Sequence, residues 1–393
     1  MWTANFAAYI SRAMQMTLLA WFVLITTNSA WLVGLIGFFT SLPMFLLGLA
    51  GGILADSFDR KKLLLITQVS NSVSVAMIIG LLYFDQANYW FAYLSALVMG
   101  TSWALDMPSR RSLIHDFMGH DRVTSAIALD SMGMSASLGI GGSLAGVLIN
   151  LVGIPGAHVV ALSFNLLAIT LIYNLHVPAT IPVSNYISTI IPDLVSGFKY
   201  VANNSILLAV ITITVIANVL LFPYMLMVPV IARDVLEVGP ALMGILQSTA
   251  GIGSICGAIL IASFTRISHH GWIFVSGTLL AFIALILFSK STYYGYSLAV
   301  LFFVGMGVSG FGAMQSSITV LVSRVNMRGK SLGVVSLAIG SGPFGSLLVG
   351  WLAESIDPGS ALNILALTGI ILVSLVLLLT PTIRQKTRQD IEI

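Results

Sequence analysis

Two ionisable residues, Arg12 and Asp130, lie deep in stretches of sequence that are otherwise apolar. Each lies about eight residues, or roughly 12 Å along a helix, from the nearer end of its apolar stretch. A charged side chain inside a bilayer is costly unless it is paired, and such residues commonly mark the path of an ion or substrate. Arg12 and Asp130 are therefore the first candidates for a site.

A second concentration of charge occurs at positions 51–62, which read GGILADSFDRKK. The segment holds Asp56, Asp59 and three consecutive basic residues, whereas only 8% of the whole chain is charged. Two interpretations stay open. Either these residues cap helix ends and fix the membrane topology, or Asp56 also belongs to a contact that opens and closes.

The elements that position these residues are membrane-spanning helices. Of the 393 residues 58% are hydrophobic, which lies outside the range of soluble proteins. Apolar runs of about 20 residues, the length that crosses a bilayer, recur along the whole chain. They predict an all-α membrane protein with twelve spans, at about 4–26, 31–55, 62–83, 89–107, 123–151, 157–176, 205–231, 240–264, 271–289, 294–321, 330–353 and 360–380.

The longest polar connection divides these spans into two sets of six. We expect an N-terminal bundle at 1–176, a cytoplasmic linker at 177–204, a C-terminal bundle at 205–380 and a cytoplasmic tail at 381–393. Apolar residues recur at helical spacing within the linker, which predicts a short amphipathic helix on the membrane surface.

The distribution of basic residues predicts the orientation, because Lys and Arg near spans stay on the cytoplasmic side. With the N-terminus inside, every Lys and Arg in the connections except Arg233 and Lys290 is cytoplasmic. We therefore expect both termini in the cytoplasm. The net charge of +3 comes from short loops that form no continuous basic face, so no nucleic-acid partner is expected.

The two halves contain a similar segment. GGILADSFDR at 51–60 aligns with GAILIASFTR at 257–266, although Ala262 stands in place of Asp56. Such repeats are typical of transporters built from two bundles around a central site. Chance similarity between two apolar helix ends is the alternative.

The pattern G-x-L-A-D-x-x-x-R at the end of the second span, in a chain of two six-helix halves, resembles the major facilitator superfamily (MFS). The closer resemblance is to its bacterial branch of siderophore (enterobactin-type) and macrolide exporters. Stretches that carry it are TTNSAWLVGL at 26–35, ALDMPSRRSLI at 104–114, VPVIARDVLEVG at 228–239 and MRGKSLGVVSLAIGSGPFGSLLVGWLAE at 327–354.

The chain departs from the pattern at two positions. Ser57 replaces the usual arginine after the loop aspartate, and Gly142 stands where drug antiporters often have proline. Glycines in the same stretch still predict close helix packing; they are Gly139, Gly141, Gly142 and Gly146.

The resemblance implies a cytoplasmic gate, because the end of span two faces the start of span eleven in this superfamily. Asp56 would meet the free N–H groups of the helix that follows Arg328, and Asp106 would pair with Arg60. The implied gate consists of Gly52, Asp56, Arg60, Asp106 and Arg328.

Spans one and five are neighbours in the superfamily, which implies an ion pair between Arg12 and Asp130. Burial favours a neutral carboxylic acid at Asp130, whereas a nearby arginine favours the carboxylate. A permanent ion pair and a proton-coupling site therefore both stay open.

Spans one, four, seven and ten line the centre of the superfamily fold, which implies a substrate cavity there. Their aromatic and amide side chains suit an amphipathic, partly aromatic or hydroxylated molecule. Helix packing is the alternative role for each of them. The set is Gln15, Trp21, Trp103, Asn218, Tyr224, Met314 and Gln315.

No catalytic set competes with this interpretation. Cys256 is the only cysteine, which excludes an intrachain disulfide and a Cys-His metal site. The six histidines are predicted in or beside loops without an acid-rich cluster. We expect no metal and no cofactor, and we expect that the protein is not an enzyme.

These observations predict a monomeric secondary transporter of the bacterial inner membrane. It would move a siderophore or drug-like molecule by alternating access, with export coupled to protons as the first expectation. Import of a siderophore or other small metabolite is the alternative, and a non-transporting receptor or enzyme is a more distant one. No motif encodes the direction.

Overall fold

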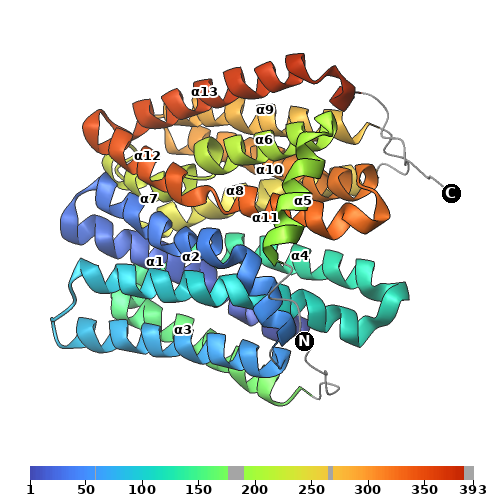
Figure 1. The fold of residues 1–393 in the computed structure, drawn as a ribbon. Helices are drawn as coiled ribbons and strands as arrows, with labels where there is room; N and C mark the ends of the chain where they lie inside the picture. The colour runs from blue at the N-terminus through green and yellow to red at the C-terminus, as the bar shows by residue number, and fades with distance from the viewer. Residues whose placement is uncertain (58, 176–189, 264–268, 385–393) are drawn as a thin grey trace. The chain divides into compact units, whose positions relative to one another are not determined.

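The computed structural model describes residues 1–57, 59–175, 190–263 and 269–384, and its elements are almost all helical. The order along the chain (Figure 1) is α1 Trp2–Thr27, α2 Ala30–Ser57, α3 Arg60–Tyr83, α4 Tyr89–Tyr173, α5 Ile190–Ala202, α6 Ser205–Ile216, the π-helix η2 Ala217–Leu221, α7 Tyr224–Asp234, α8 Pro240–Ser263, α9 His270–Ser289, α10 Tyr294–Val322, the 3-10 turn η3 Val325–Met327, α11 Arg328–Ile339, α12 Gly342–Ser355, α13 Pro358–Leu379 and the 3-10 turn η4 Pro381–Arg384.

The described residues contain ten helical stretches long and apolar enough to cross a membrane, where twelve were predicted. The difference falls in α4. Its 85 residues would extend about 130 Å as one straight rod, far more than the roughly 30 Å of a bilayer core. Gly153 has φ +72°, which a continuous α-helix does not contain, and Figure 1 draws this part of the chain as several rods.

Within α4, the stretch Leu129–Tyr173 is one of the ten candidate spans, although its 45 residues are long enough to cross a bilayer twice. The part before Leu129, which carries Asp106 and Arg110, is not among the ten. The predicted spans at 89–107, 123–151 and 157–176 therefore correspond to one helical element that changes direction, because the polar segment 108–122 between the first two is itself helical.

Two predicted spans are interrupted. The stretch 205–234 consists of α6, η2 and α7, and the π-helix ends two residues before Pro223, whose ring nitrogen has no proton to donate. The stretch 328–355 is divided into α11 and α12 at Gly340 and Ser341, just before Pro343. Proline near each break accounts for the change of helical form.

The chain forms two compact units. The first comprises Met1–Tyr186 and Met225–Ser248, and the second comprises Ile187–Tyr224 and Thr249–Ile393. Met225–Ser248 therefore packs with the first six predicted spans, although the sequence places it in the C-terminal bundle. A division of the chain at the linker stays a prediction.

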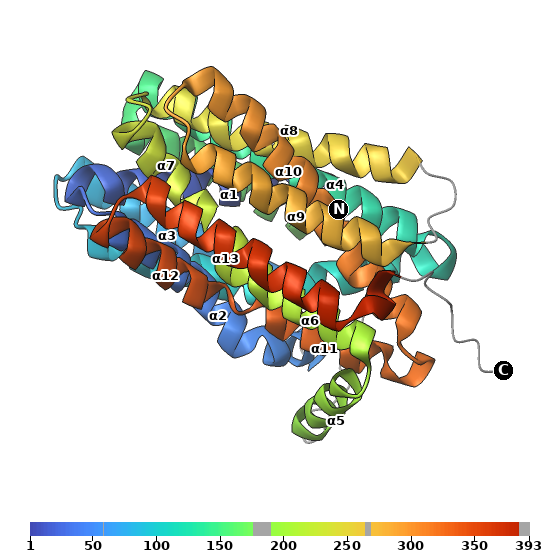
Figure 2. The ribbon, with the colours of Figure 1, turned by 90° about the horizontal axis from the view of Figure 1, so that it is seen from above.

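A helix does form in the predicted linker, where α5 covers Ile190–Ala202. It lies near the ends of α6 and α11 in Figure 2, and Gly197 of α5 comes close to the backbone of Lys330. Val201 is buried with Leu207 and Val334, whereas Phe198 is 45% exposed. These contacts fix one face of α5 within the second unit.

The core of the first unit forms around α1, most of which is buried. Ile10, Met14 and Leu18 recur at helical spacing and pack against Ala145 and Ala161 of α4. The small α4 side chains let the two backbones approach closely, as is common between membrane helices.

Close glycine packing, predicted from the sequence, is confirmed at three of its positions. A Cβ added to Gly141 would lie 2.6 Å from the Cβ of Ala13, and one added to Gly142 would lie 2.8 Å from Oε1 of Gln247. A Cβ at Gly146 would collide with the carbonyl oxygen of Pro240. These glycines therefore hold α1 and the start of α8 against α4.

Gly146→Ala should lower the thermal unfolding midpoint in detergent, because a clash with backbone is relieved only by moving the helix. Overpacking of this kind costs about 1 to 3 kcal/mol. Gly80→Ala is the matched control, since a Cβ there would meet nothing within 4 Å and alanine is the better helix former. An unchanged midpoint for Gly146→Ala would contradict the packing.

Candidate functional site

A buried ion pair lies inside the first unit, between Asp106 and Arg110 of α4. The two residues are four positions apart and thus on one helix face, and Nε of Arg110 lies 2.7 Å from Oδ2 of Asp106. Asp106 is 4% exposed and Arg110 is 1% exposed. Thr67 and Gln68 of α3 donate hydrogen bonds to the same carboxylate at 3.0 and 3.3 Å. The charge of Asp106 is therefore well compensated.

A second carboxylate is linked to this pair through α1. Asn5 donates to Oδ1 of Asp130 at 2.6 Å, and Tyr9 donates its hydroxyl proton to Oδ2 at 2.9 Å. The side-chain oxygen of Asn5 accepts a hydrogen bond from Arg110, and the Arg110 guanidinium lies 5.5 Å from the Tyr9 ring centre. Asp106, Arg110, Asn5, Tyr9 and Asp130 thus form one polar network.

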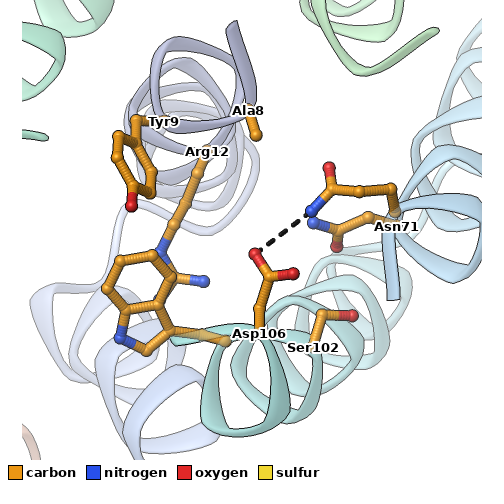
Figure 3. A pocket seen from close by; sticks show the side chains of 8 residues that line it. Ala8, Tyr9, Arg12, Asn71, Ser102 and Asp106 are labelled. Atoms are coloured by element: carbon orange, nitrogen blue, oxygen red, sulfur yellow. Dashed lines mark hydrogen bonds between the residues drawn. The ribbon is translucent and has the colours of Figure 1, made fainter. Parts of the chain in front are cut away.

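A small pocket adjoins this network. Its lining comes from α1, α3 and α4 and consists of Ala8, Tyr9, Arg12, Gln68, Asn71, Ser102, Trp103 and Asp106. Figure 3 shows Arg12 and Asn71 pointing into the same space from opposite sides, with Asp106 between them and its hydrogen bond from Gln68 drawn as a dashed line. The space has room for about one water molecule.

Arg12 has few protein partners in this pocket. Its guanidinium stacks 4.3 Å from the centre of the Trp103 ring, and Nη1 donates to the carbonyl oxygen of Met99 at 2.9 Å. An arginine has five N–H donors and keeps its charge in proteins. Among the described residues no carboxylate forms an ion pair with it.

The predicted pairing of Arg12 with Asp130 is therefore wrong in this structure. Asn5 and Tyr9 lie one turn apart on α1 and bring neutral donors to Asp130, whereas Arg12 lies further along the helix beside Trp103. The expected pairing of Asp106 with Arg60 is also wrong. The ion-pair partner of Asp106 is Arg110, which lies on the same face of the same helix.

The remaining gate residues are described only in part. The side chain of Asp56 lies outside the described residues, and Gly52 is described only as part of α2. Arg328 begins α11, whose first turn has no side-chain cap, and its Nε is buried without a hydrogen-bond partner. The role of the gate stays a prediction.

Other charges of the segment 51–62 are helix caps. Asp59 accepts a hydrogen bond from the backbone N–H of Lys62 at 3.0 Å and so caps the start of α3. Lys61 donates to the carbonyl oxygens of Tyr173 and Leu175, at 2.8 and 2.7 Å, where α4 ends. A cation is favourable there because the C-terminal end of a helix carries partial negative charge.

The predicted cavity residues fall into separate groups. Trp103 lines the pocket described above, and Gln15 donates to Ser11 on its own helix at 3.1 Å. In the second unit Asn218 donates to the carbonyl oxygen of Thr214 at 2.9 Å, and Gln315 donates to its hydroxyl at 2.7 Å. Trp21, Tyr224 and Met314 are buried.

Sequence reasoning missed several residues of the network. Asn5 and Tyr9 share a face of α1 with Arg12, and Asp106 and Arg110 are four positions apart, so helical spacing could have grouped them.

The sequence analysis also placed all histidines in or beside loops, which is wrong for His158. That side chain is 1% exposed within α4 and its Nδ1 hydrogen-bonds to the carbonyl oxygen of Ile154 at 2.9 Å.

Asp106→Asn should destabilise the protein strongly, because it leaves Arg110 buried without its counter-charge. Breaking one partner of a buried pair costs about 3 to 5 kcal/mol, whereas the double variant Asp106→Asn, Arg110→Met should cost less than the sum of the single changes. Thermal midpoints of the three variants in detergent measure the coupling. Strict additivity would show that the pair contributes nothing.

Comparisons with known proteins agree with this architecture. The family of transmembrane secretion effectors of the MFS matches residues 1–392. The staphyloferrin A transporter of Staphylococcus aureus (strain NCTC 8325 / PS 47) is 24% identical over 364 residues, which cover 90% of this chain and 88% of that protein. The enterobactin exporter EntS of Shigella flexneri is 23% identical over 262 residues, which cover 67% of this chain and 62% of that protein.

Solved structures show the same fold. A transporter of the POT family in complex with 5-aminolevulinic acid has a TM-score of 0.76 at 13% identity, with 98% of this chain and 96% of that chain covered. The apolar helices, the buried charges and a family match over nearly the whole length lead to one assignment: this chain belongs to the transmembrane secretion effector family of MFS transporters.

Proposed function

We propose that this transporter exports a siderophore or a similar amphipathic molecule across the bacterial inner membrane in exchange for protons. The observation that carries the proposal is the polar network of the first unit, in which a half-buried carboxylate is joined by hydrogen bonds to a buried ion pair. Ionisable groups in such positions commonly mark substrate paths and proton relays.

The substrate class is supported by the relatives. Two proteins that resemble this chain are a staphyloferrin A transporter and an enterobactin exporter. The name of the second also supports export rather than import. One fold hosts many substrates, however, so the choice of molecule depends on side chains rather than on the MFS architecture.

Asp130 is the proposed proton site. As a carboxylate it accepts hydrogen bonds from Asn5 and Tyr9. A proton on Oδ2 would turn Asp130 into the donor toward the Tyr9 oxygen, so the Tyr9 hydroxyl would need another acceptor. Tyr9 also lines the pocket beside Arg12 and Trp103. Protonation of Asp130 would therefore change the hydrogen bonding of Tyr9, which belongs both to the network and to the pocket.

The gate and the orientation are part of the same proposal. Both termini lie in the cytoplasm, as the basic loops indicate. Asp56 closes the cytoplasmic side against the start of α11, with Gly52, Arg60 and Arg328 beside it. The start of α11 supports this role, because its first residue is not preceded by a side-chain cap and the N-terminal end of a helix carries partial positive charge, which favours a carboxylate.

Transport into inside-out vesicles tests the proposal. A panel of staphyloferrin A, enterobactin, a macrolide and a cationic dye is supplied outside, with and without an acidic lumen. We expect at least one siderophore to accumulate, and to do so only when protons can flow out. Accumulation only in the absence of the pH gradient would refute proton-driven export and favour import.

Asp130→Asn should abolish the dependence on the proton gradient, because an amide cannot take up a proton, while exchange of substrate across the membrane continues. Tyr9→Phe should weaken the coupling, since the hydroxyl that joins Asp130 to the pocket is lost. Asp85→Asn is the control: this residue lies between α3 and α4 with φ 53°, which asparagine also tolerates. Undiminished gradient dependence in Asp130→Asn would remove Asp130 from the coupling mechanism.

A further inference from the structure

The pocket between α1, α3 and α4 separates an arginine from a carboxylate. Arg12 and Asp106 both line it, and Figure 3 shows the two side chains pointing into the same space. The ion-pair partner of Asp106 is Arg110, and Arg12 forms no direct pair with the carboxylate. The opposite charges of Arg12 and Asp106 nevertheless attract each other across the pocket. A small polar molecule between them would join the two groups.

The carboxylate of Asp106 has an acceptor position left for such a molecule. Its Oδ1 accepts a hydrogen bond from Thr67, and its Oδ2 accepts from Arg110 and Gln68. A carboxylate offers about four acceptor positions, two on each oxygen. A position on Oδ1 therefore remains for a further donor.

The guanidinium of Arg12 has donors left on the other side of the pocket. Nη1 donates to the carbonyl oxygen of Met99, and the group stacks on the ring of Trp103. Stacking occupies a face of the planar guanidinium, whereas its N–H groups point outward from the edge. Further N–H groups of Arg12 are therefore available to an acceptor.

Two neutral side chains in the lining also have unused hydrogen-bonding capacity. Oδ1 of Asn71 is buried and accepts no hydrogen bond from the protein. The Ser102 hydroxyl donates to the carbonyl oxygen of Thr67 at 3.2 Å, so its own oxygen is still able to accept. Since buried polar atoms are rarely left without a partner, a molecule in this pocket has to donate as well as accept.

We propose that the pocket binds one water molecule, which accepts a hydrogen bond from Arg12 and donates one to Asp106. The space has room for about one water, and a buried water typically makes about three hydrogen bonds. Its second proton has the oxygen of Asn71 or of Ser102 as acceptor. A metal cation would be repelled by Arg12 and a halide by Asp106, whereas a neutral water suits both charges.

The water makes Asp106 the common partner of two arginines. Arg110 binds the carboxylate directly, and Arg12 binds it through the water. Arg110 also donates to Asn5, which donates to Asp130, so one connected network contains both arginines and both carboxylates. The site does not depend on the transported molecule, and its test is therefore independent of the transport assay.

A crystal structure of the full-length protein, at a resolution that shows ordered waters, tests the proposal. We expect one density peak at hydrogen-bond distance, about 2.7 to 3.2 Å, from both Arg12 and Asp106. The peak should give no anomalous signal when bromide replaces chloride in the buffer. An empty space, a direct contact between the two side chains or bromide at the site would overturn the proposal.

Variant structures test the role of the arginine. Arg12→Met should remove the peak and leave the pair of Asp106 and Arg110 in place, because methionine has no N–H group to donate. Gln15→Met is the matched control and should keep the peak. Gln15 is also a buried polar residue of α1 with an unpaired oxygen, but it does not line this pocket. An unchanged peak in Arg12→Met would overturn the bridge.

Thermal unfolding midpoints in detergent give a second test that needs no crystals of the variants. Arg12→Met should lower the midpoint less in the Asp106→Asn background than in the unmodified protein, because the bridge has then already lost its carboxylate. Gln15→Met should shift the midpoint equally in both backgrounds. Additive shifts for Arg12→Met and Asp106→Asn would overturn the proposal.

Discussion

The buried ion pair between Asp106 and Arg110 is the interaction on which the first unit depends. Helices in lipid gain little from the hydrophobic effect, so contacts between polar groups contribute much of their specificity. Here one carboxylate receives donors from α3 and α4, and its arginine partner reaches Asn5 of α1. Three helices are thereby held in one register around a charge that cannot be left unpaired.

The same pair determines what the neighbouring residues are able to do. Arg110 forms the ion pair with Asp106, whereas Arg12, which lines the same pocket as Asp106, stacks on Trp103 and donates to the carbonyl oxygen of Met99. Since Asn5 and Tyr9 satisfy Asp130 with neutral donors, that carboxylate is held without a direct cationic partner among the described residues. Two cations and two carboxylates balance each other, yet only one of the four possible pairings is formed as an ion pair.

Close backbone contact is the second constraint, and it explains why Met225–Ser248 belongs to the first unit. Gly142 and Gly146 of α4 face Gln247 and Pro240 without room for a methyl group. Arg233 adds a polar attachment, because its guanidinium donates to the carbonyl oxygen of Leu24 at 2.9 Å and to Asn28 at 2.8 Å, where α1 ends. This role accounts for one of the two basic residues that the topology prediction places outside.

The sequence by itself determined the class of the protein, because the length and repetition of apolar runs depend only on composition and bilayer thickness. Its motifs also indicated the MFS family, and it identified Arg12 and Asp130 as unusual charges. Only the tertiary structure decided their partners. Pairing depends on which helix faces meet and on how far each side chain reaches. The sequence does not show whether a carboxylate accepts hydrogen bonds from neutral side chains or from an arginine. The hydrogen bonds of Asn5 and Tyr9 to Asp130 and the stacking of Arg12 on Trp103 became visible only when α1 and α4 were packed together.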